Sequence, residues 1–385
     1  MKCLRCQNED PRFFYKDHGL WYCRKCVQFS RLDVGLRPLR PALSRKSFPQ
    51  PPVWKYELTP KQKQVSQEIL HHLMHGKDVF LYAATGAGKT ECTIGAIHHY
   101  LKQGKKVGFA ISRRQVVLEI RERLQAIFPF CHVIAVAQGF TAEVDGDLIV
   151  CTMHQLYRYP FSFDLLIMDE IDAFPFTGDP VLHAIADQAC TGQTLCLSAT
   201  PDRRSLQAIE KGEMEVVTLF QRPHGHGLPV PTIHRGEDGW LWMRLIVECR
   251  QMIRQDRQIL LFVPTRQDAF WMYQLFRFFV KTCYVHSALE TKDQVIRDFR
   301  ERKTKICITT TLLERGIKLP SVQVIVWQGQ HSVFTTASLV QIFGRAGRSF
   351  QDPDGKGVCL CRYITPSVKE CVQLIQRMND SVPSV

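Results

Sequence analysis

The chain has 385 residues, of which 45% are hydrophobic and 23% charged, a composition typical of a globular protein with room for two or three domains. Lysine and arginine outnumber aspartate and glutamate 50 to 37, which gives a formal net charge of +13. An excess of this size favours a polyanionic partner, with nucleic acid ahead of anionic lipid. Charge alone leaves open a soluble protein that is merely basic.

The sequence gives no sign of export or of insertion into a membrane. The opening residues, MKCLRCQNED, lack the apolar stretch of a secretion signal, and no run approaches the roughly 20 apolar residues of a membrane span. The aromatic-rich stretch 269–280 carries Gln274 and Arg277, so we expect a helix packed in a core there. We expect a cytoplasmic protein without a transmembrane segment, and docking at the cytosolic face of a membrane stays open.

Composition divides the chain into five segments. Residues 1–30 hold two CxxC pairs, and residues 31–54 are rich in proline and arginine with little periodicity, which predicts a basic linker. In residues 55–222, and again in residues 240–385, short apolar runs alternate with longer helix-patterned stretches. Residues 223–239 (PHGHGLPVPTIHRGEDG) interrupt the pattern, and their prolines and glycines predict a hinge.

This alternation predicts an α/β fold with one lobe in each block, each built from a mostly parallel sheet covered by helices. Only the first block carries a glycine-rich loop of the phosphate-binding kind. The apolar runs that we expect to form strands are Val79–Ala83, Val107–Ile111, Leu148–Cys151, Leu165–Met168, Leu195–Leu197, Ile259–Val263, Ile306–Ile308, Val324–Trp327 and Val358–Leu360.

The glycine-rich loop follows the first predicted strand and leads into a helix pattern, which is the order that a phosphate loop requires. Glycines let backbone N–H groups turn toward phosphates, and the helix N-terminus adds a favourable dipole. Lys89 is placed to reach the β- and γ-phosphates of ATP, and the Thr90 hydroxyl to ligate Mg²⁺. A turn without nucleotide is the alternative, because Ala83 stands where the usual pattern has glycine. The loop residues are Ala83, Ala84, Thr85, Gly86, Ala87, Gly88, Lys89 and Thr90.

Two adjacent carboxylates follow another apolar run. Residues 163–168 lead directly into Asp169 and Glu170. Such a pair at the end of a strand suits metal holding and water activation, with Asp169 in the Mg²⁺ shell and Glu170 polarising the attacking water. An acidic turn after a buried strand is common, so this motif gains its weight from following Lys89 in the expected order.

Two arginines stand close together near the end of the second block. The stretch 341–348 (QIFGRAGR) places Arg345 and Arg348 three residues apart, and one turn of helix would put both on the same face. A guanidinium that reaches the γ-phosphate from a separate lobe acts as an arginine finger. The glycines around these arginines argue against a simple solvated face.

In chain order, these motifs and the stretch 198–200 (SAT) resemble the motifs of superfamily 2 helicases. The resemblance covers residues 55–365 and implies two RecA-like lobes with ATP in the cleft between them. Two departures point away from the DEAD-box RNA helicases. The sequence at 169–172 is DEID, and Gln341 stands where that family has histidine.

The same resemblance implies further contacts. It assigns the reading of adenine to Gln62, and it assigns the link between nucleotide and bound strand to Thr309 and Gly316 in the stretch TTTLLERG. The residues that it places on a nucleic-acid backbone are Arg113, Arg114 and Thr152, together with Thr309.

Four cysteines near the N-terminus have the spacing of a zinc site. They form two CxxC pairs separated by sixteen residues, and four thiolates so spaced close a tetrahedron around Zn²⁺ with no position left for catalysis. Disulfides are the alternative, which a cytosolic setting disfavours. Aromatic residues between the pairs suit either stacking on a single strand or a small core. The ligands are Cys3, Cys6, Cys23 and Cys26.

A four-cysteine module ahead of a superfamily 2 core resembles the late-competence DNA-uptake ATPases, the ComFA family. The primosomal restart helicases have similar motifs, but they are far longer and carry their cysteines near the second lobe. The ComFA resemblance implies an ATP-driven motor on the cytosolic face of the membrane, working with other competence proteins. It would draw single-stranded transforming DNA through a channel protein.

Other functions stay open on the sequence alone. They are a primosome-type or repair DNA helicase, an RNA-remodelling helicase and a non-catalytic adaptor. The adaptor is disfavoured because the catalytic candidates Lys89, Glu170, Arg345 and Arg348 are all present. We expect single-stranded DNA as the ligand, with help from the basic linker residues Arg31, Arg37, Arg40, Arg45 and Lys46.

Overall fold

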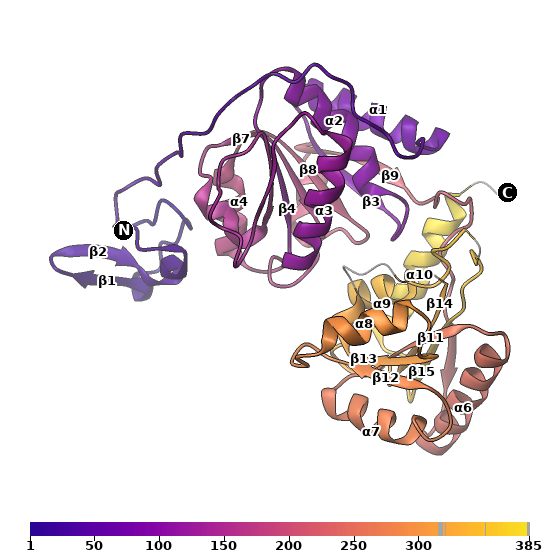
Figure 1. The fold of residues 1–385 in the computed structure, drawn as a ribbon. Coiled ribbons are helices and arrows are strands. Elements are labelled where there is room, and N and C mark those ends of the chain that lie inside the picture. The colour runs from indigo at the N-terminus through magenta and orange to yellow at the C-terminus, as the bar shows by residue number, and fades with distance from the viewer. Residues whose placement is uncertain (315–318, 320, 351, 383–385) are drawn as a thin grey trace. The chain divides into compact units, whose positions relative to one another are not determined.

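A computed structural model describes residues 1–314, 319, 321–350 and 352–382 of the chain (Figure 1). A small antiparallel hairpin lies near the N-terminus, and two larger sheets follow, of seven and six strands. Every neighbouring pair of strands in the larger sheets is parallel. This confirms the predicted α/β fold with two RecA-like lobes and a four-cysteine segment before them.

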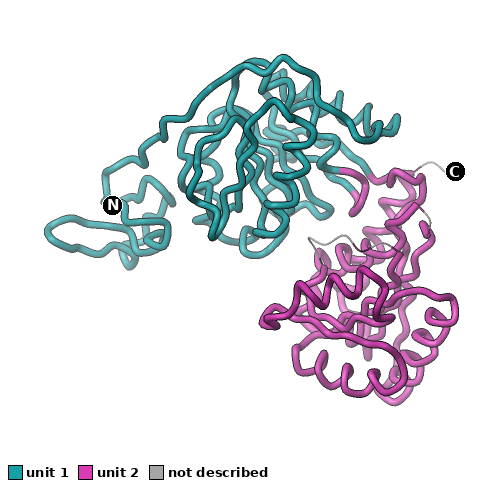
Figure 2. The backbone as a smooth tube through the Cα atoms, viewed as in Figure 1, with its two compact units in different colours: residues 1–83, 89–219 teal, residues 84–88, 220–385 magenta. Residues whose placement is uncertain are grey.

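The chain divides into two compact units (Figure 2). The first holds residues 1–83 and 89–219, and the second holds residues 84–88 and 220–385. The cysteine segment and the linker, which we predicted as separate segments, therefore belong to the same unit as the first lobe. Most of the predicted phosphate loop, 84–88, groups with the second unit, although the elements on either side of it group with the first.

The sheet of the first lobe has the strand order β5-β6-β4-β7-β8-β3-β9. Right-handed crossovers place α2 and α3 on one face and the short helix η3 with α4 and α5 on the other. The central strands β4 and β6 contain only buried residues, because both faces are covered. The strands are β3 (Asp78–Ala83), β4 (Val107–Ile111), β5 (Val133–Val136), β6 (Leu148–Thr152), β7 (Phe163–Asp169), β8 (Cys190–Ser198) and β9 (Met214–Leu219). The helices are α1 (Pro60–Met74), α2 (Lys89–Lys102), α3 (Arg114–Ile127), η3 (Met153–Arg158), α4 (Pro180–Ala189) and α5 (Arg203–Glu210).

The second sheet has the order β10-β15-β14-β11-β13-β12. By the same crossover rule, α6 and α7 cover one face, and α8 and α9 cover the other. The strands are β10 (Thr232–Arg235), β11 (Gln258–Phe262), β12 (Thr282–Val285), β13 (Ile306–Thr309), β14 (Val322–Trp327) and β15 (Gly357–Cys361). The helices are α6 (Asp238–Arg254), α7 (Arg266–Phe276), α8 (Lys292–Arg300), η4 (Thr311–Glu314), α9 (Thr336–Phe343) and α10 (Pro366–Asp380).

The N-terminal segment packs against the first lobe. Its elements are η1 (Pro11–Phe13), the hairpin of β1 (Phe14–Asp17) and β2 (Leu20–Cys23), and η2 (Arg24–Phe29). The four cysteines and the rings of Phe14 and Phe29 belong to one buried apolar cluster with residues of η3 and α4. Gln188 of α4 also donates a hydrogen bond of 2.8 Å to the carbonyl of Leu4. We call residues 1–30 the zinc module.

The predicted linker is attached to the first lobe over part of its length. The Ser44 N–H donates to Asp145, and the Arg45 guanidinium forms an ion pair of 2.6 Å with Asp164. Further along, the N–H groups of Phe48 and Val53 donate to carbonyls at the C-terminal ends of α2 and α3. These partners lie at the edge of the sheet where the strands begin. We call residues 44–53 the strap.

All nine apolar runs predicted as strands form strands, with ends that differ by a few residues. The sequence missed β5, β9, β10 and β12, which are the edge strands of the two sheets. Three of these strands, β9, β10 and β12, are covered less completely, so their apolar pattern is weaker; β10, for instance, contains no fully buried residue. This reason does not extend to β5, which is apolar throughout and largely buried. The predicted hinge at 223–239 is wrong in its second half, because β10 and the start of α6 lie there.

The prediction of a helix packed in a core at 269–280 holds for one face only. Ala269, Met272 and Phe276 of α7 are buried. In contrast, Trp271 is 62% exposed, and Phe279, beyond the end of the helix, is 81% exposed. The aromatic side chains of this stretch are therefore divided between a buried face and an exposed face. Among the described residues, no helix is long and apolar enough to cross a bilayer.

Candidate ATP, zinc and strand-binding sites

The candidate residues of the first lobe lie where its strands end. The phosphate loop follows β3, Ser198 ends β8, Asp169 ends β7, Arg113 follows β4 and Thr152 ends β6. Since the strands are parallel, these ends meet at one edge of the sheet. The order β6-β4-β7-β8-β3 then places the strand-binding candidates on one side of Asp169 and the phosphate loop on the other.

The phosphate loop has the local geometry that the motif requires. Ala83 is the last residue of β3 and Lys89 is the first of α2, so the strand, loop and helix follow without a gap. Gly86 and Gly88 adopt left-handed conformations, with φ of +84° and +92°, which side chains rarely tolerate. These turns bend the loop in front of a helix N-terminus, an arrangement that fits the phosphates of ATP.

Asp169 and Lys89 face one another at this edge. Their side chains form an ion pair of 3.9 Å, and both are largely shielded from solvent. Burial raises the pKa of Asp169 to about 6, and the Lys89 cation opposes that rise. A buried carboxylate beside the phosphate loop fits Mg²⁺, whose charge would replace the hydration that Asp169 has lost. Thr90, the other expected Mg²⁺ ligand, is buried at the start of α2.

Glu170 has a strained backbone. Its φ is +56°, a left-handed conformation that costs a non-glycine residue about 1–3 kcal/mol. The Glu170 N–H points back to Asp169 Oδ1 at 2.9 Å and lies 3.0 Å from the carbonyl of Leu197 at the end of β8. The neighbouring strand thus stabilises the turn that follows Asp169.

One link between two of the motifs was not predicted from the sequence. The hydroxyl of Ser198 donates to Asp172 Oδ1 at 2.7 Å, and the hydroxyl of Thr200 donates to Asp172 Oδ2 at 2.6 Å. Asp172 therefore ties the carboxylate motif at 169–172 to the SAT stretch after β8. The bidentate pattern explains why both hydroxyl residues flank Ala199, but it depends on a strand pairing that spacing alone does not reveal.

The remaining candidates of the first lobe are arranged as follows. Gln62 lies in the first turn of α1, where its amide oxygen accepts the N–H of Thr59 in a capping box. Arg113 occupies the N-cap position of α3 without a side-chain capping bond, and the Arg114 guanidinium lies over the ring of Phe140 at 5.1 Å. Thr152 is buried. All four lie on the first lobe, and the role of each remains a prediction.

In the second unit, the arginine motif is not helical. Helix α9 ends at Phe343, so Arg345 and Arg348 lie in turns beyond it, and the expectation that one helical turn aligns them is wrong. Arg345 is buried, whereas Arg348 is half-buried and donates to the Gly344 carbonyl at 2.8 Å. The glycines explain why the helix does not continue through the two arginines, because Gly347 has a φ of +64°, a left-handed conformation incompatible with a helix.

Arg222 is a residue of this unit that the sequence analysis did not single out. It is buried, and its guanidinium donates to the carbonyls of Gly344, Ala346 and Gly347 at 2.7–2.8 Å. Burial lowers the pKa of Arg222 to about 9. In the same unit, the Thr85 hydroxyl donates to the side chain of Gln341 at 3.2 Å. Thr309 is fully buried at the end of β13, and Gly316 lies outside the described residues.

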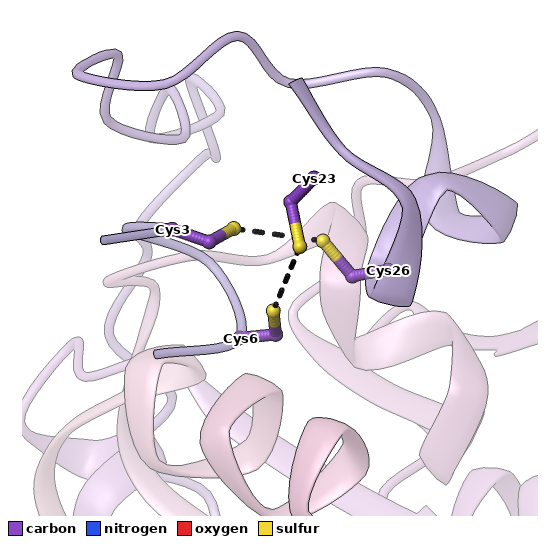
Figure 3. A group of neighbouring side chains, drawn as sticks. All are labelled: Cys3, Cys6, Cys23 and Cys26. Carbon is purple, nitrogen blue, oxygen red and sulfur yellow. Dashed lines mark hydrogen bonds between the residues drawn. The ribbon is translucent and has the colours of Figure 1, made fainter. Parts of the chain in front are cut away.

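The four cysteines converge on one point (Figure 3). The sulfurs of Cys3 and Cys26 are 3.6 Å apart, those of Cys6 and Cys23 are 3.7 Å apart, and all four lie within 4.8 Å of one another. Zn–S bonds of about 2.3 Å in a tetrahedron separate sulfurs by about 3.8 Å. The donor set therefore fits a structural Zn²⁺.

Comparisons with known proteins agree with this geometry. The DEAD/DEAH box helicase family matches residues 59–209, and the helicase conserved C-terminal domain matches residues 242–350. The competence protein ComFA of Streptococcus pneumoniae is 31% identical, over 98% of this chain and 90% of its own length. The chain belongs to the ComFA family. The ComFA of Bacillus subtilis is 30% identical, over the whole of this chain and 87% of its own length.

Members of other helicase families share the two-lobed part. RecG of Streptococcus pneumoniae is 24% identical over 83% of this chain and 51% of its own length. The structure of S. cerevisiae Dbp5 bound to RNA and ADP BeF3 has a TM-score of 0.61 at 18% identity, over 85% of this chain and 93% of that one. RecG bound to a three-way DNA junction has a TM-score of 0.60. With its ComFA relatives, the chain is therefore a nucleic-acid-dependent ATPase of superfamily 2.

We predict that the purified protein contains one Zn²⁺ per chain and that changing Cys23 and Cys26 to serine removes it. The zinc module is too small to fold on its own core, so metal binding supplies its folding energy. Elemental analysis of protein prepared without chelator measures the metal. As a control, Cys190→Ser alters a half-buried thiol outside the cluster and should leave the zinc in place. Unmodified protein without zinc would contradict the assignment.

We predict that Asp172→Ala lowers the free energy of unfolding of the first lobe by about 2 kcal/mol. The change leaves the buried Thr200 hydroxyl without its acceptor and removes one of the two acceptors within reach of the Ser198 hydroxyl. Urea unfolding followed by tryptophan fluorescence measures the change. Asp187→Ala removes a carboxylate from an exposed ion pair with Arg204 and should cost well under about 1 kcal/mol. Equal losses in the two variants would show that the link between the motifs does not stabilise the lobe.

Proposed function

We propose that the protein is an ATP-dependent translocase that moves along single-stranded DNA and drives the uptake of transforming DNA during competence. The observation that carries the proposal is the match to ComFA proteins over nearly the whole chain, zinc module included. The joint placement of ATP and strand-binding candidates along one sheet edge supports it, because a motor must couple the two.

The proposed roles in hydrolysis follow from the chemistry of each side chain. Lys89 holds the β- and γ-phosphates, while Thr90 and Asp169 hold Mg²⁺, which offsets phosphate charge when it is bound. Glu170 accepts a proton from the attacking water. Gln62, in the first turn of α1, contacts the adenine. The loop residues 84–88 offer backbone N–H groups to the phosphates.

Arg345 and Arg348 are proposed to stabilise the charge that develops on the γ-phosphate. We infer that Arg222 holds the turn that carries them, since it engages three of its carbonyls. Gly316 and Thr309 belong to the stretch proposed to link nucleotide and strand, and the burial of Thr309 favours an indirect role there. A lobe that responds to both ligands converts hydrolysis into movement.

The strand is proposed to lie along the ends of β4 and β6, near Arg113, Arg114 and Thr152. Phosphate contacts of this kind give little sequence preference. The linker contributes less than the sequence suggests, because the guanidiniums of Arg31 and Arg45 are already paired with carboxylates. Among the basic residues proposed to help, those that are exposed and have no ion pair within the described chain are Arg37, Arg40 and Lys46.

We propose that the protein acts at the cytosolic face of the membrane, together with other competence proteins. The ComFA relatives support this placement through their competence role. The net charge of +13 favours an anionic ligand, in keeping with DNA.

We predict that Lys89→Ala and Glu170→Gln both abolish ATP turnover but differ in ATP binding. Lys89 contacts phosphates before the reaction, so its loss weakens binding as well as hydrolysis. Glu170 acts on the water, so its loss leaves ATP bound and unhydrolysed. Equilibrium binding of labelled ATP and steady-state hydrolysis separate the two effects. Near-normal turnover in either variant would show that this edge of the sheet is not the active site.

We predict that single-stranded DNA stimulates hydrolysis more than single-stranded RNA or duplex DNA of equal length. The measurement is the steady-state ATPase rate against the concentration of each nucleic acid. Stronger stimulation by RNA would favour an RNA-remodelling helicase. Stimulation that requires a duplex junction, with strand separation, would favour a repair-type helicase. No hydrolysis under any condition would favour a non-catalytic adaptor.

The same titration, repeated at several salt concentrations, tests the linker. Each phosphate contact contributes a slope of about −0.7 in log affinity against log salt. Arg40→Ala should reduce the slope by about that amount. Arg45→Ala is the matched control, because that guanidinium is occupied by Asp164. Unchanged slopes in both variants would remove the linker from the binding surface.

A further inference from the structure

The strand-binding candidate Thr152 ends β6, and η3, a short helix of six residues, follows it directly. Helices of the 3-10 type have poor hydrogen-bond geometry and are marginal alone, so η3 depends on what packs around it. Met153 and Leu156 anchor one side of η3 in the core. His154 and Tyr157 point from the helix to another neighbour.

That neighbour is Phe29, the last residue of η2 in the zinc module. Its ring lies 5.6 Å from the ring of Tyr157 and 6.1 Å from that of His154, measured between ring centroids. These are ordinary distances for aromatic contact. Phe29 is 4% exposed, so the contact is closed to solvent. Burial also lowers the pKa of His154, which favours the uncharged form of this ring.

The zinc ligands determine where Phe29 lies. Phe29 follows the ligand Cys26 by three residues, and Cys26 lies at a kink within η2. The next residue, Ser30, has a φ of +76°, and Arg5 holds it by donating to its carbonyl at 2.6 Å and to its hydroxyl. Arg5 itself is buried between the ligands Cys3 and Cys6. Both CxxC pairs therefore constrain the backbone around Phe29, one through Cys26 and the other through Arg5.

We propose that Phe29 is a positioning residue, through which the zinc-folded module holds η3 in the conformation that binds the strand. The inference rests on the proposed function, since η3 must lie on the strand for its position to matter. It assigns the zinc module a mechanical role: zinc binding orders Phe29, Phe29 packs on η3, and η3 presents the residues around Thr152. Mutations along such a packed path alter coupling about 2- to 30-fold.

Direct stacking of the module on the strand makes a different prediction. The exposed rings of Phe13 and Trp21 would do the stacking, with exposures of 37% and 41%. Lys25 lies over the ring of Phe13 at 5.3 Å, an arrangement that also suits a phosphate contact. If the module acts by stacking, removing Phe13 affects DNA binding and removing the buried Phe29 does not.

The experiment compares Phe29→Ala and Phe29→Leu with Phe13→Ala in the full-length protein. We expect Phe29→Ala to raise the concentration of single-stranded DNA that half-saturates ATPase stimulation about 10-fold. The basal ATPase rate, the KM for ATP and the zinc content should stay unchanged. Phe29→Leu should give a smaller rise, Phe29→Tyr should restore most of the affinity, and Phe13→Ala should have no effect.

The results of these variants either support or overturn the proposed role of Phe29. Zinc-loaded Phe29→Leu and Phe29→Ala proteins with unchanged DNA half-saturation would overturn the proposal, and so would a larger effect from Phe13→Ala. If Phe29→Ala loses its zinc, the Leu and Tyr variants supply the comparison at full zinc content. If the unmodified protein is not stimulated by single-stranded DNA, the proposed function fails, and this inference fails with it.

Discussion

The constraint on which this molecule depends is that every strand of each lobe runs in the same direction. A parallel sheet gathers the ends of its strands along one edge, and whatever follows each strand is brought there regardless of its distance in sequence. In the first lobe this edge receives the phosphate loop, the Asp169–Asp172 carboxylates and the SAT stretch. The hydroxyl bonds to Asp172 and the ion pair between Lys89 and Asp169 are possible only because of that convergence.

The same constraint explains which parts of the fold can be predicted from the sequence. Central strands are covered on both faces, so they read as uninterrupted apolar runs, and all nine of those were predicted. Three of the four edge strands, β9, β10 and β12, share that burial only in part. In β10, which carries His234 and Arg235, nothing distinguishes the strand from a loop without knowledge of its neighbour β15.

The candidate sites likewise contain residues that the sequence predicts and contacts that it does not. The residues that act through their own chemistry, such as Lys89, Asp169 and the four cysteines, could be predicted from type and spacing. Features that depend on contacts distant in sequence could not. The link through Asp172 needs the pairing of β7 with β8, and the non-helical arginine turn needs the left-handed Gly347. The strap likewise requires carboxylates 100 residues or more along the chain, such as Asp164 opposite Arg45.

The strap has a consequence for how motion in this protein could be observed. It crosses the first lobe at the edge where the strands begin, away from the edge that carries the phosphate loop. The zinc module is thus joined to its lobe by the strap and by direct packing, in which Phe14 and Phe29 take part. A fluorophore on the exposed hairpin of the module would share the reference frame of the first lobe. Distances from such a label to the second lobe would then report any movement between the two lobes during ATP turnover.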